Sequence, residues 1–161
     1  MEDILIENCV FGESHGTLTL GSECIHARNI TIRNCKVENN CPILRMKMRP
    51  DTYQIFENIT VDGITGSCGS LIDLNPWKQF FNLAGSTEKP YAIVRNITLS
   101  NITVKCKQFG TIDGNPADSI SSILLRNITA TAETPALKNR YPGIKAENVI
   151  VNGSSLVINK E

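Results

Sequence analysis

Hydrophobic and polar residues alternate in short segments that recur along the whole chain. Each segment opens on Asn or Asp, continues through residues rich in Ile, Val, Thr and Leu, and closes on Asn or Gly. Period-2 alternation of β-branched residues predicts a strand, and Asn and Gly tolerate the left-handed backbone of a turn. The copies begin at residues 3, 29, 58, 96, 127 and 148, and the last two copies are fainter. The pattern therefore predicts a chain built from strands.

The spacing of these copies predicts how the strands are arranged. Successive starts are 26, 29, 38, 31 and 21 residues apart. Strand repeats of this length are typical of a solenoid in which each repeat forms one coil. We therefore expect an all-β fold: a right-handed single-stranded parallel β-helix (solenoid) of roughly six coils. Residues 1–161 form a single domain in this interpretation. Strand residues from position 4 onward predict that N-terminal coils and a cap are missing.

A second strand is expected after the repeat strand of each early coil. Alternation within these strands predicts inward side chains at Leu18, Leu20, Leu44, Met46, Ile72 and Leu74. The outward side chains then form two rows across neighbouring coils. The first row contains Thr19, Arg45, Asp73 and Asp113, and the second contains Gly21, Lys47, Asn75 and Asn115. These rows predict a polar outer face on which charged groups are neighbours.

The long spacing between the third and fourth copies predicts an inserted loop. Residues 75–90 leave the coil pattern and hold the only tryptophan of the chain, Trp77. With Phe80 and Phe81, this tryptophan could stack on a sugar ring, or the aromatic residues could anchor the loop on the coils. Both roles remain open, and Trp77 is kept as a candidate substrate-binding residue. A second loop is expected at residues 110–122, and a final coil or hairpin at 149–158.

The charge balance narrows the classes of partner. The chain has 16 basic and 16 acidic residues, so its formal net charge is zero. Such a balance gives no reason to expect nucleic acid or an anionic membrane as a partner. No apolar run is long enough to cross a bilayer, and no export signal is visible at the N-terminus, so the location stays unknown from the sequence. We do expect self-association through the open N-terminal coil.

The six cysteines do not follow the spacing of a metal site. No CxxC motif is present, and Cys9 and Cys35 occupy the same place in successive repeats. Stacked thiols that point into the core explain this placement better than a disulfide does. We accordingly expect no structural metal.

Two short motifs, one coil apart, could carry chemistry. The first is Ser14-His15-Gly16, in which a glycine-bounded turn favours an exposed imidazole. The second is Arg45-Met46-Lys47, whose outward Arg45 and Lys47 offer a guanidinium fork and an ammonium group suited to a sugar carboxylate. The alternative is that Arg45 only forms a surface ion pair with Asp73, which contributes about 0–1 kcal/mol to stability.

In this order, the two motifs resemble those of glycoside hydrolase family 28, the polygalacturonase family. Its members carry a Gly-His-Gly segment and, on the next coil, an Arg-Ile-Lys strand; here Ser14 replaces the first Gly and Met46 replaces Ile. The resemblance covers most of the chain. It implies pectin or galacturonate oligomers as the ligand, no cofactor, and proteins that are usually secreted or periplasmic. It also implies substrate binding by Arg45, Lys47, Ser14 and Gly16, and a supporting catalytic role for His15.

The resemblance is incomplete at the catalytic acids. The family cleaves α-1,4-galacturonosyl bonds with inversion, using aspartates in an Asn-Thr-Asp segment and an Asp-Asp pair that precede the Gly-His-Gly segment. Neither motif precedes His15 here, and Asp3 lies inside a repeat strand. The later aspartates lie on coils where the family keeps no catalytic acid. We therefore expect the C-terminal half of such a hydrolase, inactive as this chain alone.

Two other interpretations stay open. The chain could be a non-catalytic β-helix that binds acidic polysaccharide or has a structural role. A β-helix pectate lyase is the third interpretation, but it would need an acidic calcium-binding cluster, which the sequence does not contain.

Overall fold

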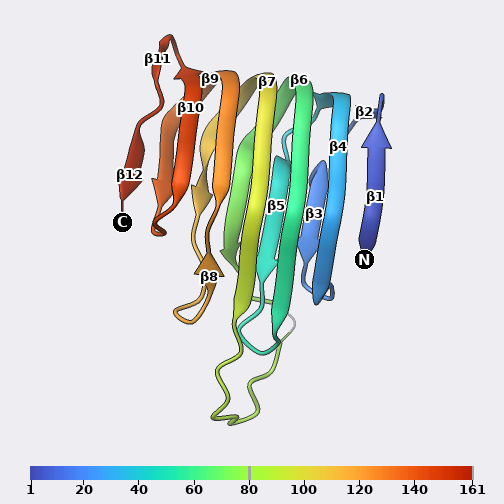
Figure 1. The fold of residues 1–161 in the computed structure, drawn as a ribbon, viewed down its shortest axis with the longest axis vertical. Helices are drawn as coiled ribbons and strands as arrows, with labels where there is room; N and C mark the ends of the chain where they lie inside the picture. The colour runs from blue at the N-terminus through green and yellow to red at the C-terminus, as the bar shows by residue number, and fades with distance from the viewer. Residues whose placement is uncertain (80, 161) are drawn as a thin grey trace.

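The protein is all-β, and its strands form a mostly parallel sheet (Figure 1). The structure, a computed structural model, describes residues 1–79 and 81–160. All the regular secondary structure among these residues is β-strand. None of the described residues lies in a helix with the length and apolar character of a membrane span.

Five strands form most of the sheet, and seven shorter ones complete it within the described residues. The five are β4 (His26–Glu38), β6 (Gln54–Pro76), β7 (Ala92–Ile112), β9 (Ile123–Asn139) and β10 (Ile144–Val151). The shorter strands are β1 (Glu2–Glu7), β2 (Val10–Phe11), β3 (Leu18–Gly21), β5 (Pro42–Met48), β8 (Ser119–Ile120), β11 (Ser154–Ser155) and β12 (Ile158–Lys160). Their main order is β1-β4-β6-β7-β9-β10-β11 (Figure 1).

Each repeat segment lies beside the next copy in parallel register. Ile30 of β4 pairs with Ile59 of β6, and Ile59 pairs with Ile97 of β7. The expected repeat strand and second strand are joined in β6, whose first part pairs with β4 and whose last part pairs with β5. The expectation of an all-β fold with parallel pairing is confirmed.

The register corrects the positions of the last two repeats. Ile97 pairs with Ile123, not with the residue after Asn127, so the fifth copy begins at Ser122 and the spacing is 26 rather than 31 residues. The sixth copy likewise begins at Gly143, before Ile144 of β10. Both starting residues have positive φ, 54° at Ser122 and 86° at Gly143. The sequence pattern placed these starts five residues late because Ser and Gly replace Asn at the turn.

The recurring asparagines form hydrogen-bonded ladders across the strands. The side-chain amide of Asn29 donates to Asp3 Oδ1 at 2.8 Å, that of Asn58 donates to Asn29 at 3.1 Å, and that of Asn96 donates to Asn58 at 3.1 Å. These asparagines have φ between 55° and 58°. Asparagine suits the position because it adopts left-handed backbone more readily than most residues and both donates and accepts through its side chain.

The inward side chains form one hydrophobic core along the stack. Ile30, Ile59 and Ile97, which are register partners, are each fully buried, as are Phe56 and Phe109. The expected inward residues Leu18, Leu20, Leu44, Met46, Ile72 and Leu74 are all buried as well. Alternation with period 2 therefore identified this face of the strands correctly.

The outward rows agree with the prediction except at the fourth strand. Thr19, Arg45 and Asp73 are register partners on β3, β5 and β6. The next partner of Asp73 is Thr111, not Asp113. Asp113 instead lies beside the second row, since its backbone N–H donates to the carbonyl of Leu74. The reason is that the offset of 38 residues between β6 and β7 holds up to the end of β7, with no bulge that would shift Asp113 by two positions.

The cysteines are all free thiols. Cys35, Cys68 and Cys106 are buried, and Cys68 lies in register with Cys106. The backbone N–H of Cys9 is 3.5 Å from Cys35 Sγ, which agrees with the expected stacking of these residues. Cys9 itself is exposed rather than inward, because β1 and β2 lie at the edge of the sheet.

The loops occur where the sequence pattern breaks. The inserted loop joins β6 to β7, and a shorter loop at residues 113–118 joins β7 to β8 (Figure 1). At the C-terminal end, β11 forms an antiparallel hairpin with β10, while β12 returns to pair in parallel with β9. The last segment therefore combines the two expected alternatives, a hairpin and a further parallel strand.

Candidate functional site

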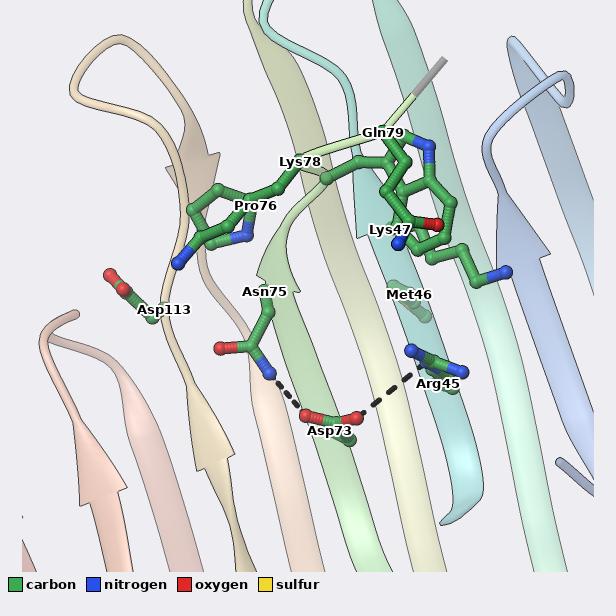
Figure 2. A pocket seen from close by; sticks show the side chains of 10 residues that line it. Arg45, Met46, Lys47, Asp73, Asn75, Pro76, Lys78, Gln79 and Asp113 are labelled. Carbon is green, nitrogen blue, oxygen red and sulfur yellow. Dashed lines mark hydrogen bonds and ion pairs between the residues drawn. The ribbon is translucent and has the colours of Figure 1, made fainter. Parts of the chain in front are cut away.

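Outward side chains of β5 and β6 form a cleft with the start of the inserted loop. Its volume is about 360 Å³ (Figure 2). The described residues that line it are Arg45, Met46, Lys47, Asp73, Asn75, Pro76, Trp77, Lys78, Gln79 and Asp113. Three of the candidates from the sequence, Arg45, Lys47 and Trp77, therefore meet in one place.

Strand geometry explains why these groups converge. Arg45 and Lys47 are two residues apart on β5, so both side chains point outward, and their register partners on β6 are Asp73 and Asn75. The loop is fixed to the same edge, because the backbone N–H of Trp77 donates to the carbonyl oxygen of Met48 at 2.7 Å. The first residues of the inserted loop are thereby held as a wall of the cleft.

Asp73 lies at the base of the cleft between two polar neighbours. Its Oδ2 is 3.7 Å from Arg45 Nε, and its Oδ1 accepts a hydrogen bond from the Asn75 side-chain amide (Figure 2). Burial raises the pKa of the Asp73 carboxyl, although Arg45 and Asn75 both act in the opposite direction. Arg45 is thus partly neutralised by a carboxylate in the ligand-free protein.

Lys47 contacts the tryptophan. Its Nζ lies 4.3 Å from the centre of the Trp77 ring, a distance at which an ammonium group is attracted to the face of an indole. Desolvation lowers the pKa of Lys47, and the positive charge of Arg45 lowers it further. The Trp77 Nε1 atom is buried and has no hydrogen-bond partner among the described residues. Trp77 therefore has a packing role against Lys47 whether or not a sugar also stacks on it.

The second carboxylate of the cleft is also paired with an arginine. Asp113 Oδ1 lies 3.2 Å from Arg140 Nε and accepts a hydrogen bond from the Gly114 N–H at 2.8 Å. A further hydrogen bond, from Arg140 to the carbonyl oxygen of Gly114 at 2.8 Å, fixes the guanidinium beside this loop.

The motif around His15 does not reach this cleft. Ser14, His15 and Gly16 lie between β2 and β3 and are not among the residues that line it. The link is indirect: Thr19, the register partner of Arg45, donates from Oγ1 to the His15 carbonyl oxygen at 3.3 Å. Ser14 and His15 are exposed. Their roles in sugar binding and catalysis remain predictions.

Some lining residues were not identified from the sequence. Lys78 and Gln79 follow Trp77 on the inserted loop, and their only sequence signal is that neighbourhood. Phe80 lies outside the described residues, and Phe81 does not line the cleft. No group of three or more His, Cys, Asp or Glu side chains that could hold a metal ion occurs at residues 1–79 and 81–160.

Comparisons of the chain with protein-family models, with curated proteins and with solved structures find no match.

Proposed function

We propose that the parallel strands are the coils of a right-handed β-helix. Register partners follow one another at intervals of 26, 29, 38, 26 and 21 residues, from Ile4 through Ile30, Ile59, Ile97 and Ile123 to Ile144. A chain that returns to pair in parallel after each such interval is what a solenoid requires. A crystal structure in which each interval makes one right-handed turn supports this proposal, and a flat open sheet contradicts it.

We propose that the cleft binds acidic polysaccharide of the pectin type, as galacturonate oligomers. The observation that carries this proposal is the meeting of Arg45, Lys47 and Trp77 in one cleft. A sugar ring has apolar C–H faces that stack on an indole, and its carboxylate suits a guanidinium or ammonium group. Asp73 keeps Arg45 oriented, so that the guanidinium is held in position before a ligand arrives.

At the level of reaction, the resemblance supports a polygalacturonase-like hydrolase. We propose that this chain corresponds to the sugar-binding C-terminal half and that it does not hydrolyse galacturonosyl bonds by itself. The two carboxylates of the cleft, on Asp73 and Asp113, are each engaged by an arginine. That pairing favours roles in positioning cations over roles as a proton donor and a base.

A non-catalytic binding protein is the second candidate. The same cleft supports it, since binding needs only the cations and the tryptophan. The two candidates differ in whether aspartates supplied from outside this chain create hydrolysis.

The proposed function is tested by titrating trigalacturonate into the protein and assaying reducing ends on polygalacturonate. We expect binding without hydrolysis, and affinity about tenfold weaker in Lys47→Met, because a partly desolvated charged hydrogen bond contributes about 1.5–3 kcal/mol. Lys105→Met is the matched control, since Lys105 is exposed on β7 and outside the cleft. Unchanged affinity in Lys47→Met would reject this site, and hydrolysis by the wild-type chain would reject the assignment of inactivity.

A further inference from the structure

We propose that Lys78 is a second carboxylate-binding position and that the cleft therefore takes a ligand with at least two acidic sugar units. This inference rests on the proposed function, because it concerns the same cleft. It adds a residue from the inserted loop to the two cations of β5, and it predicts a dependence on the length of the ligand.

The pairing of charges in the cleft is the first step of the argument. Its two carboxylates each have an arginine partner: Asp73 is 3.7 Å from Arg45, and Asp113 is 3.2 Å from Arg140. Each pair is close to electroneutral. Neither aspartate is therefore left to compensate the lysines of the same cleft.

The two lysines carry the remaining positive charge. Lys47 lies over the Trp77 ring, and neither Lys47 nor Lys78 forms an ion pair with a carboxylate among the described residues. Two uncompensated ammonium groups in one cleft raise the local concentration of anions and favour a ligand with two negative charges.

The two ammonium groups do not converge on one point. Figure 2 shows the Lys78 side chain extending toward the side of Asp113, while Lys47 lies on the opposite side, above Arg45. One carboxylate cannot satisfy both positions at once. Two carboxylates on neighbouring units of one oligomer can do so, and the second then binds without a new loss of translational freedom.

Chain length separates this inference from simple charge attraction. We expect the affinity to rise from monogalacturonate to digalacturonate in the wild-type protein. In Lys78→Met, the affinity for digalacturonate falls by about threefold, as for an exposed ion pair, while that for monogalacturonate is unchanged. The control is Lys89→Met, which removes an exposed lysine of the same loop outside this cleft. Methionine keeps the length of the side chain and removes only the charge.

The outcomes separate this inference from the proposed function. If Lys47→Met weakens binding but Lys78→Met leaves the affinity for digalacturonate unchanged, the proposed function holds and the role of Lys78 is rejected. If Lys78→Met and Lys89→Met weaken binding equally, the effect reflects net charge and the inference is also rejected. If the wild-type protein binds neither ligand, both proposals fail.

Discussion

Arg45 and Asp73 face each other from the same register position of neighbouring strands, with 3.7 Å between Arg45 Nε and Asp73 Oδ2. The pair places a buried carboxylate below the guanidinium that is proposed to bind a sugar carboxylate. An incoming anion therefore meets repulsion from Asp73 as well as attraction from Arg45. The charge of Asp73 is expected to set the strength of binding.

Neutralising Asp73 is predicted to tighten binding. In Asp73→Asn, the guanidinium of Arg45 loses its carboxylate partner and becomes fully available to an acidic ligand, which we expect to raise the affinity for trigalacturonate at pH 7 by about threefold. Glu133→Gln is the control, because it makes the same change of charge at an exposed residue of β9 outside the cleft. Weaker binding by Asp73→Asn would mean that Asp73 mainly holds Arg45 in position.

The pH dependence follows from the direction of the Asp73 shift. Burial raises the pKa of this carboxyl above its usual value of 3.8, so Asp73 takes up a proton while carboxylates of ordinary pKa are still ionised. Binding of an acidic oligomer by the wild-type protein should strengthen as the pH falls from 7 toward that raised pKa. In Asp73→Asn this rise should be absent, and titrations at several pH values measure it.

The same shift has a consequence for stability. Because the folded protein holds the proton of Asp73 more tightly than the unfolded chain does, the free energy of unfolding decreases as the pH rises from about 3.8 through the raised pKa. Denaturant unfolding of wild type and Asp73→Asn over this range measures the difference. A decrease of the same size in both proteins would show that other groups cause it.

His15 provides a test of the resemblance against the geometry. Since His15 does not line the cleft, we expect His15→Ala to change the affinity for trigalacturonate less than twofold. The variant should also unfold as the wild type does, because the side chain is exposed. A loss of affinity as large as that of Lys47→Met would place His15 in the sugar-binding site, as the resemblance implies.

The asparagine ladder gives a prediction for stability. Asn58 donates to Asn29, accepts from Asn96 and has a φ of 56°. Asn58→Ala loses both hydrogen bonds and strains the left-handed backbone, so we expect it to lower the free energy of unfolding by about 2 kcal/mol.

The matched variant is Asn58→Gly, which keeps the backbone unstrained and loses only the hydrogen bonds. We expect it to lower the free energy of unfolding by about 1 kcal/mol. Gly63, with a φ of 64°, already occupies the equivalent turn of the neighbouring ladder. Equal losses in the two variants, measured by denaturant unfolding, would show that backbone strain is not part of the effect.

The parallel stacking was predictable because the signal repeats. Each copy alternates, and each begins at a residue that adopts left-handed backbone, so the pairing of Ile30 with Ile59 followed from the spacing alone. The fifth and sixth copies were misplaced because Ser122 and Gly143 meet the same backbone requirement without being asparagine. A search for positive-φ residues in general, rather than for Asn, would have found them.

The candidate site was predictable where it lies on strands. Alternation and register placed Arg45 beside Asp73 without any knowledge of the loops. Lys78 and Arg140 were missed, because the path of a loop and the direction of its side chains do not follow from a period in the sequence. Asp113 shows the limit between the two cases, since it is the first residue after β7 and was placed in the wrong row.

The central claim is that the cleft selects an acidic saccharide. Calorimetric titration of trigalacturonate, compared with the neutral galactose trimer at low and high salt, tests it most directly. We predict binding of the acidic trimer that weakens as salt is added, and no binding of the neutral trimer. Equal affinity for the two trimers, or no binding of trigalacturonate at low salt, would contradict the account.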